Sequence, residues 1–257
     1  MDGMFPGLLP RGKKTIRLQR RQGQRGGNGR TRGICVSMTC SWTYEHYRSC
    51  IAKAREHGYA LLPFKEVASY PETQPLIILR HDIDRSLSRA LTMARMEKEL
   101  GVRATYFVRV HAPTYNVFEY NTYRALQEIR SLGHEIGLHF EAVDFGHING
   151  EAPLEVFQRE KAVLETALNI TVVSAAAHGE HSRSGPGHNR DFFQCFTKEQ
   201  VGIKYDAYDT AFTREMKYIS DSSGIWREGC MCNHIGKYPR LQILVHPCWW
   251  FKDHPFE

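Results

Sequence analysis

Short apolar runs alternate with amphipathic stretches along most of the chain. The runs are rich in Ile, Val, Leu and aromatic residues, which is typical of buried strands. We predict strands at residues 76–81, 104–110, 135–139, 171–177 and 241–246. Between them, apolar residues recur at helical spacing, and we predict helices over residues 44–57, 86–100, 120–132 and 153–168. This alternation predicts parallel strands joined by helical crossovers, and therefore an α/β barrel or an open α/β sheet.

The strand ends carry the candidate chemistry. Four predicted strands run into acidic or imidazole side chains, in the segments Arg80-His81-Asp82-Ile83-Asp84, Leu138-His139, Ala177-His178 and Val245-His246. In α/β barrels the active site is assembled at the carboxyl ends of the strands. We therefore expect these four segments to meet in one site.

Two carboxylates on one strand face point to a cation. In an extended strand, Asp82 and Asp84 point to the same face and His81 to the other. Two carboxylates so close together are stable only if a cation lies between them or if one of them takes up a proton. Asp84, His139 and His178 form a mixed carboxylate and imidazole set. Such a set suits a divalent metal, zinc above all, with positions left for water and substrate.

The second acid and the last histidine supply an acid–base pair. If Asp84 holds the metal, Asp82 is free to act as general base on a water molecule. His246 can protonate the leaving group, because the ordinary pKa of histidine is close to neutrality. Its neighbours Pro247, Trp249 and Trp250 also fit a packed structural corner.

Several residues remain alternatives to His178 as the third ligand. His181 and His188 lie in the same loop as His178, which is rich in Gly, Ser and Pro. Glu141 and His147, which follow His139, are further candidates.

Three residues are candidates for substrate binding. His111 ends a predicted strand, and Trp249 offers a wall for a sugar ring. Arg227 lies in the polar segment 221–228 and can meet a carboxylate or a phosphate. That segment can equally be a turn that enters a strand.

Cysteine usage favours reduced thiols. The chain has seven cysteines without a regular framework, which indicates a cytoplasmic protein rather than a disulfide-bonded one. Cys230, Cys232 and His234 lie close together in sequence. Because no second pair lies near them in the sequence, we interpret these cysteines as free thiols rather than as a zinc knuckle.

Charge is distributed unevenly. Residues 1–33 carry nine Arg or Lys and only one acid, Asp2, so they supply +8 to a net charge of +6 and leave −2 for the rest. We expect residues 1–37 to be a disordered basic leader, or translated sequence upstream of a start at Met38. Because no aromatic residues interleave with its arginines, we expect no nucleic-acid partner.

The rest of the chain has the composition of a globular domain. The apolar content of the whole chain, 42%, is ordinary for a protein with such a domain. No apolar run is long enough to span a bilayer, and no signal-peptide block begins the chain. We therefore expect a cytoplasmic protein with a single domain over residues 38–257.

Three motifs resemble the polysaccharide deacetylases of the NodB-homology type, carbohydrate esterase family 4. The likeness covers about residues 76–250 and is closest to the uncharacterised cytoplasmic branch of that family. Asp82-Ile83-Asp84 is similar to the family's pair of acids, in which the first is a base and the second a metal ligand. Residues 133–139, Gly-His-Glu-Ile-Gly-Leu-His, match the run that leads to a metal-binding His, and Leu244-Val245-His246 matches the last motif. Because His134 directly follows the end of a predicted helix, we interpret it as a turn residue rather than a ligand.

The resemblance implies a distorted (β/α)7-type barrel and metal-dependent removal of an acetyl group from an N-acetylated sugar. Two features depart from the family. Its second metal-binding His falls on Val143, and residues 177–180, Ala-His-Gly-Glu, stand where an Arg-Pro-Pro motif is usual. We expect His178 to replace the lost ligand, with Glu141 as the alternative.

These observations lead to one main hypothesis and two rivals. We expect a metal-dependent N-deacetylase that acts on a carbohydrate in surface-polysaccharide or glycan biosynthesis. One rival is an inactive barrel that binds a glycan or a sugar nucleotide. The other keeps the metal and hydrolyses a different amide, such as a cyclic amide or a formyl group.

Overall fold

The computed structural model describes residues 40–179 and 187–253. The predicted leader, residues 1–37, lies outside this part, as does His181. The strands are β1 (Ala60–Leu62), β2 (Leu76–Ile83), β3 (Thr105–Val108), β4 (Glu135–Phe140), β5 (Ser174–Ala177), β6 (Tyr205–Asp206), β7 (Lys217–Ser220) and β8 (Arg240–Val245). No helix in these two ranges is long and apolar enough to cross a membrane.

Eight helices accompany the strands. They are α1 (Tyr44–Glu56), α2 (Leu87–Glu99), α3 (Tyr120–Ser131), α4 (Ala142–Asn149), α5 (Pro153–Leu168), α6 (Phe192–Cys195), α7 (Lys198–Val201) and α8 (Thr210–Thr213), counted over the described ranges. Short 3-10 turns add η1 (Phe64–Ser69), η2 (Asn189–Asp191), η3 (Ser222–Gly224), η4 (Met231–Asn233) and η5 (Pro247–Trp249). The four long helices predicted from sequence, α1, α2, α3 and α5, are all present.

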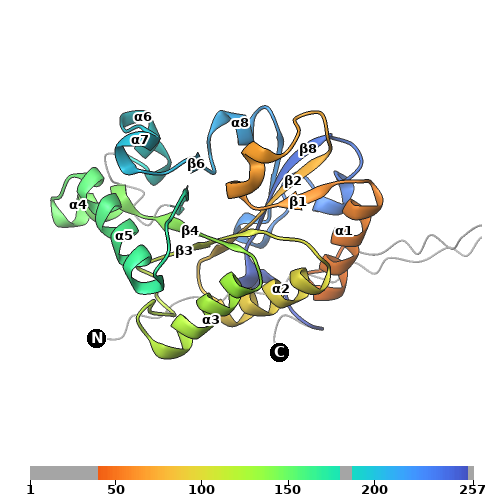
Figure 1. Ribbon diagram of the computed structural model, residues 1–257, viewed down its shortest axis with the longest axis horizontal. Coiled ribbons are helices and arrows are strands. Elements are labelled where there is room, and N and C mark those ends of the chain that lie inside the picture. Colours follow the sequence, from red (N-terminus) through yellow and green to blue (C-terminus); the bar gives the residue numbers. More distant parts are fainter. Residues whose placement is uncertain (1–39, 180–186, 254–257) are drawn as a thin grey trace, which may run out of the picture. The chain divides into compact units, whose positions relative to one another are not determined.

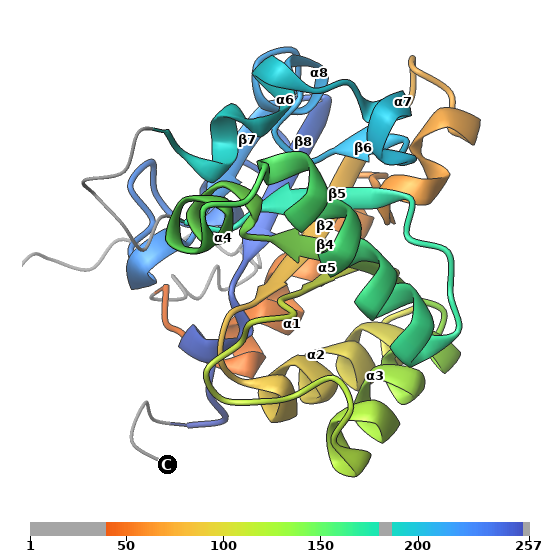
Figure 2. The same ribbon diagram turned by 90° about the vertical axis from the view of Figure 1, so that its left-hand side faces the viewer.

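All strand pairs in the sheet are parallel. Seven strands follow the order β6-β5-β4-β3-β2-β8-β7, and β1 pairs with β2 beside this path. No pairing joins β6 to β7 within the described residues, so the sheet is not closed by backbone hydrogen bonds. Helices α2, α3 and α5 lie along its outer face (Figures 1 and 2). The predicted α/β class and distorted (β/α)7-type barrel are confirmed.

The central strand β2 shows how the two faces are packed. Ile77 and Leu79 belong to the large core between sheet and helices, whereas Leu76 and Ile78 belong to a second core. The members of this second core inside the curve of the sheet are Phe64, Leu76, Ile78, Phe107, Ala176, Ala207, Phe212 and Met216. Because side chains alternate along a strand, Arg80 and Asp82 follow on this inner face. The apolar filling therefore gives way to charged groups toward the carboxyl end of β2.

Gly137 on β4 is required by this inner packing. A Cβ atom at Gly137 would lie 2.5 Å from the ring of Phe107 and 2.7 Å from Ser174 Oγ. The absent side chain lets Phe107 fill the interior two residues before His139. The last residues of β4 are thus supported from below by a buried aromatic ring.

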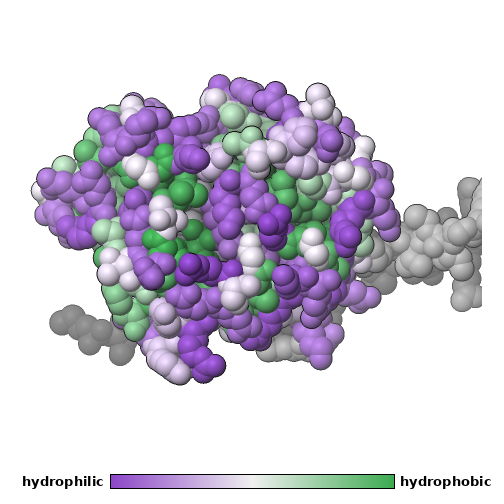
Figure 3. Space-filling model, viewed as in Figure 1, coloured by the Kyte–Doolittle hydropathy of each residue, from purple (hydrophilic) through white to green (hydrophobic). Residues whose placement is uncertain are grey.

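The elements that sequence patterns missed are mostly short. Strands β1, β6 and β7 have three, two and four residues, too few for a period to be recognised. Strand β5 begins at Ser174 rather than at residue 171. Hydrophilic residues cover most of the face shown in Figure 3, with hydrophobic residues visible between them, as is usual for a water-exposed surface.

Candidate metal centre and acid–base pair

The parallel sheet brings four strand ends to one edge. Asp84 directly follows β2, His139 lies near the end of β4, His178 follows β5, and His246 follows β8. These strands are neighbours or next-neighbours in the sheet. The expectation that the four segments meet in one place agrees with this arrangement.

Three of these side chains converge on one point. Asp84 Oδ1 lies 3.2 Å from His139 Nε2 and 3.7 Å from His178 Nε2. One donor atom from each residue lies within 4.8 Å of the others. The two imidazole rings are perpendicular, with centroids 5.1 Å apart, so that both present an edge nitrogen to the carboxylate.

Both imidazoles face a polar oxygen atom through Nδ1, on the side away from Asp84. His139 Nδ1 lies 2.9 Å from the carbonyl oxygen of Ala176 on the neighbouring strand. Because a carbonyl only accepts, Nδ1 must carry the proton. His178 Nδ1 lies 3.1 Å from Glu141 Oε1. Partners of this kind fix the tautomer of metal-binding histidines and turn Nε2 toward the ion.

The electrostatics of the cluster fit a cation. Oδ1 of Asp84 is buried and has no hydrogen-bond donor of good geometry among the described residues. Burial raises the pKa of Asp84, but the three surrounding imidazoles outweigh it and hold the pKa well below its usual value. His139 Nε2 also faces Asp82 Oδ2 at 3.4 Å. A lone pair facing two carboxylates is stable only when a proton or a metal ion lies between them.

Asp82 is held by an arginine that sequence analysis did not single out. Arg80 donates from Nε to Oδ1 at 3.1 Å and from Nη2 to Oδ2 at 2.7 Å. Burial raises the pKa of Asp82, but Arg80 and then His139 more than offset this and lower it. The ring of Tyr208 packs against Arg80, with the guanidinium 4.6 Å from the ring centroid. Asp82 is therefore an ionised and rigidly placed carboxylate.

His246 is oriented by Asp221, a second residue that the motifs did not reveal. Asp221 Oδ1 lies 2.6 Å from His246 Nδ1, and Trp250 Nε1 donates to Oδ2 at 3.1 Å. Burial lowers the pKa of His246, but Asp221 raises it more strongly, to about 9. Nε2 of His246 lies 3.8 Å from Asp84 Oδ2. The side chain is therefore a protonated imidazolium at the edge of the Asp84 cluster.

Glu141 supports the cluster from outside rather than pointing into it. Arg109 donates to both of its carboxylate oxygens, at 3.2 and 2.7 Å, and His178 lies on the same carboxylate. Among the alternatives to His178, His147 and His188 line a cavity of about 600 Å³ beside α4. Val143, at the position of the lost family ligand, is a half-buried apolar residue of α4.

The three residues predicted to bind substrate lie in different settings. His111 follows β3, stacks on Phe145 at 3.8 Å between centroids, and has Nε2 3.3 Å from Glu160 Oε1. Arg227 lines a cavity of about 250 Å³. The Trp249 ring packs against Gly224, and its Nε1 is buried without a hydrogen-bond acceptor among the described residues.

Two histidines near the motifs have structural roles. His81 lies on the helix-facing side of β2, opposite Asp82, with Nε2 2.6 Å from the buried Glu97 of α2. His134 accepts from the backbone N–H of Ala104 and lies 3.0 Å from the carbonyl of Ala94. Both are buried in the layer between sheet and helices and take no part in the cluster at Asp84.

Arg80 and Asp221 show what the sequence patterns left out. Arg80 stands within the first motif, where alternation along the strand would have placed it beside Asp82. Asp221 directly follows β7, a strand of four residues that the apolar pattern did not predict. A carboxylate after a strand was the available signal, but the strand had to be recognised first.

Comparison with known proteins gives matches at the level of structure. No family model and no curated protein matches the chain. The chain is similar to a Streptococcus pyogenes deacetylase solved with acetate, at 14% identity and a TM-score of 0.46, covering 78% of this chain and 80% of that one. It is similar to a family 4 carbohydrate esterase from Bacillus anthracis, at 16% identity and a TM-score of 0.43, covering 76% and 75%. It is also similar to a family 4 pseudoenzyme from the same organism, at 13% identity and a TM-score of 0.43. That match covers 69% of this chain and 56% of the pseudoenzyme.

Proposed function

We propose that this protein is a metal-dependent hydrolase that removes an acetyl group from an N-acetylated sugar. The proposal rests on one observation: a possible metal site and a possible acid–base pair lie together at one edge of the sheet. One is the Asp84, His139 and His178 cluster, and the other is the acid–base pair formed by Asp82 and His246. A carboxylate base and an imidazolium acid beside a three-donor cation site are the groups that amide hydrolysis requires.

Asp84, His139 and His178 would hold the ion, which we propose to be zinc. Three protein donors of this mixed kind leave a position for water or substrate, as in catalytic zinc sites. When bound, such an ion polarises the acyl carbonyl and makes a water molecule more acidic. The carbonyl of Ala176 and the carboxylate of Glu141 keep the two imidazoles in the tautomer that this requires.

Asp82 would take the proton of the attacking water. Its carboxylate is ionised, and its Oδ2 atom lies 3.4 Å from Nε2 of His139. It is therefore adjacent to the proposed metal site. The two hydrogen bonds from Arg80 prevent it from turning toward Asp84 as a second ligand. The arginine thus separates the roles of two carboxylates only two residues apart.

His246 would give its proton to the departing amine. Because Asp221 accepts from Nδ1, the proton on Nε2 is the one that faces the cluster. The raised pKa of about 9 keeps this proton in place at neutral pH. Substrate would lie between this imidazole and Asp82, and we propose Trp249, His111 and Arg227 as its surroundings.

The test combines metal content with product analysis on the full chain. Purified protein is analysed for metal and incubated with N-acetylglucosamine, its β-1,4-linked oligomers and UDP-N-acetylglucosamine, and released acids are followed by proton NMR. We expect acetate. Formate, or ring opening of a cyclic amide, would indicate hydrolysis of another amide by the same site. Sugar binding without metal and without product would contradict the proposal and favour the inactive barrel.

A further inference from the structure

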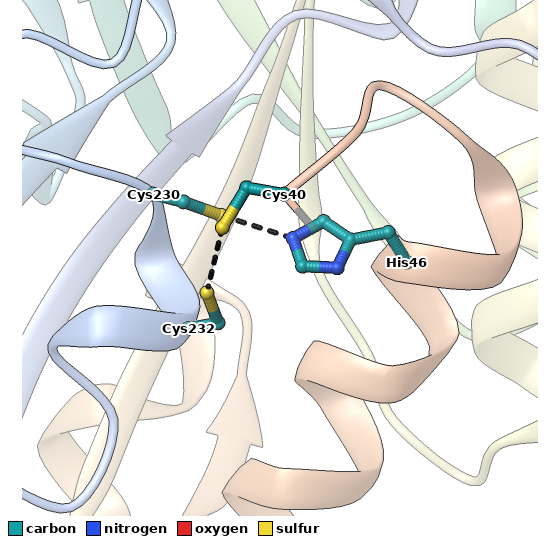
Figure 4. Close-up of side chains that lie close together, drawn as sticks. All are labelled: Cys40, His46, Cys230 and Cys232. Atoms are coloured by element: carbon teal, nitrogen blue, oxygen red, sulfur yellow. Dashed lines mark hydrogen bonds between the residues drawn. The ribbon is translucent and has the colours of Figure 1, made fainter. Parts of the chain in front are cut away.

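A second group of metal-capable side chains lies away from the strand ends. Cys40 precedes α1, His46 lies in the first turn of α1, Cys230 directly precedes η4, and Cys232 lies within η4. Their donor atoms all lie within 4.8 Å of one another. Figure 4 shows the three sulfur atoms and the imidazole pointing toward one another. Residues about 190 positions apart are therefore brought together here.

The spacing of these atoms suits a tetrahedral ion. Cys40 Sγ lies 3.4 Å from Cys232 Sγ, and His46 Nε2 lies 3.2 Å from Cys230 Sγ. Four ligands around zinc, with Zn–S bonds of about 2.3 Å, stand about 3.5–3.8 Å from one another. The two measured pairs therefore need to move apart by only a few tenths of an ångström, and the remaining pairs lie within 4.8 Å of one another.

The free-thiol interpretation rested on the lack of a second pair near Cys230 and Cys232, and the fold supplies that pair. Cys40 and His46 come from the other end of the domain. His234, the histidine close in sequence, is directed elsewhere, with Nε2 2.9 Å from the carbonyl of Glu228. Three sulfurs and one imidazole nitrogen form the Cys₃His set of structural zinc sites.

The group is buried on one side and open on the other. His46 and Cys230 are 5% and 4% exposed, whereas Cys40 is exposed and Cys232 is half-buried. The His46 ring is stacked on that of Trp250, with 6.5 Å between the ring centroids. Three thiolates and one zinc ion carry a net charge of −1. Lys53 places its ammonium group 2.6 Å from the carbonyl oxygen of Cys232, where a positive charge would be favourable.

The position of the group explains what an ion would contribute. The backbone N–H of Tyr44 donates to the carbonyl of Phe251 at 2.8 Å, and the backbone N–H of Phe251 donates to the carbonyl of Trp42 at 2.9 Å. The ring of Trp42 stacks on Trp226 at 5.8 Å. The segment before α1 therefore packs on elements from the last part of the domain. An ion bound by Cys40, His46, Cys230 and Cys232 would join this segment and α1 to η4 through four bonds.

We propose that Cys40, His46, Cys230 and Cys232 bind one zinc ion in a closed, four-ligand site that fastens α1 to the segment between β7 and β8. This site is independent of the proposed hydrolase activity. Thiolate ligands favour zinc over magnesium or calcium. No position is left for substrate, so the ion is structural.

Cobalt separates this site from the Asp84 cluster without any substitution. The full chain is purified from cells grown with cobalt, and its near-ultraviolet and visible absorption is recorded. Cobalt bound to thiolates gives sulfur-to-metal charge-transfer absorption, whereas a centre made of Asp84, His139 and His178 contains no sulfur. We expect this absorption in the wild-type protein and in His139→Ala. Its absence from cobalt-loaded wild-type protein would overturn the proposal.

Substitutions then identify the ligands. The double variant C230S/C232S is expected to lose the charge-transfer absorption and one metal equivalent. Cys50→Ser is the matched control, because Cys50 Sγ lies 3.6 Å from His46 Nε2 yet is not one of the proposed ligands. Cys195→Ser controls for an exposed thiol on α6. A metal-free protein with a Cys40–Cys232 disulfide, detected by mass spectrometry under non-reducing conditions, would also overturn the proposal.

Discussion

The domain contains two clusters of side chains that can bind a metal ion. They differ in the number of donor atoms and in the secondary-structure elements on which the donors lie. The Asp84, His139 and His178 cluster lies at the ends of parallel strands, has three donors and is bordered by Asp82 and His246. The Cys40, His46, Cys230 and Cys232 cluster lies on a helix, a turn and the segment before α1, and has four donors. The charged group described beside the second cluster is the ammonium of Lys53, which donates to the carbonyl oxygen of Cys232.

The difference shows how position in the fold decides what a metal can do. The ends of strands in a parallel sheet are rigid and lie along one edge. Ligands on them can therefore hold a metal ion in a fixed geometry and leave one coordination position open. Side chains from segments far apart in sequence can instead complete a shell and thereby fasten those segments together. The first arrangement suits chemistry and the second suits stability. Four variants test this contrast.

His139→Ala should have the largest effect. It removes an imidazole at the centre of the first cluster, so we expect loss of one metal equivalent and fall of acetate release to background. Thiolate-to-cobalt absorption should persist, because the second cluster is untouched. His147→Ala, on the cavity beside α4, is the control and should retain both metals. Full metal retention in His139→Ala would mean that the cluster at Asp84 is not the binding site.

Asp82→Asn should abolish most activity while leaving both metals in place. Loss of a general base typically lowers the rate by about 10²–10⁴-fold, and Asn keeps a hydrogen-bond acceptor for Arg80. Metal content, circular dichroism and acetate release are measured together. Asp84→Asn is the comparison and should lose the metal of the first cluster. If Asp82→Asn loses metal instead, the roles of the two carboxylates are reversed.

Cys232→Ser should act on stability. If the substitution weakens zinc binding by about a thousandfold at saturating zinc, the free energy of unfolding falls by about 4 kcal/mol. Thermal unfolding with and without added zinc measures this change. Cys195→Ser, an exposed cysteine outside the cluster, should unfold as the wild type does. Equal unfolding of the two variants, with no response to zinc, would remove the structural role from the second cluster.

Asp221→Asn should shift the alkaline limit of activity. His246 works as an acid only while protonated. Burial lowers its pKa, but Asp221 above all, with Asp82 and Asp84, raises it to about 9. Without that carboxylate the pKa returns toward about 6.5, so kcat/KM at pH 8 should fall by about 30-fold and change little below pH 6. Asp209→Asn, an α8 cap paired with Lys198, is the control. An unchanged alkaline limb in Asp221→Asn would exclude His246 as the acid.

The same raised pKa has a consequence for stability. Since the folded-state pKa of His246 lies above its ordinary value, the protonated form stabilises the folded protein below about pH 6.5. This contribution is lost as the pH rises through about 9. The pH dependence of unfolding should therefore be weaker in Asp221→Asn over this range.

The sequence alone determined the main architecture and the first cluster. Apolar runs such as residues 76–79 bury a strand on both faces, which parallel sheets require, and the helices between them follow from spacing. Because carboxyl ends of parallel strands meet at one edge, Asp84, His139 and His178 could be placed together without coordinates. The opposite directions of Asp82 and His81 followed from strand geometry in the same way.

Tertiary structure decided which partner each group has. Arg80 meets Asp82 because both lie on the inner face of β2. Asp221 meets His246 because β7 and β8 are neighbours in the sheet. Periodicity shows which face of an element is buried, but not which distant element covers it. Cys40 and His46 were therefore brought to Cys230 and Cys232 only by the packing of the two ends of the domain.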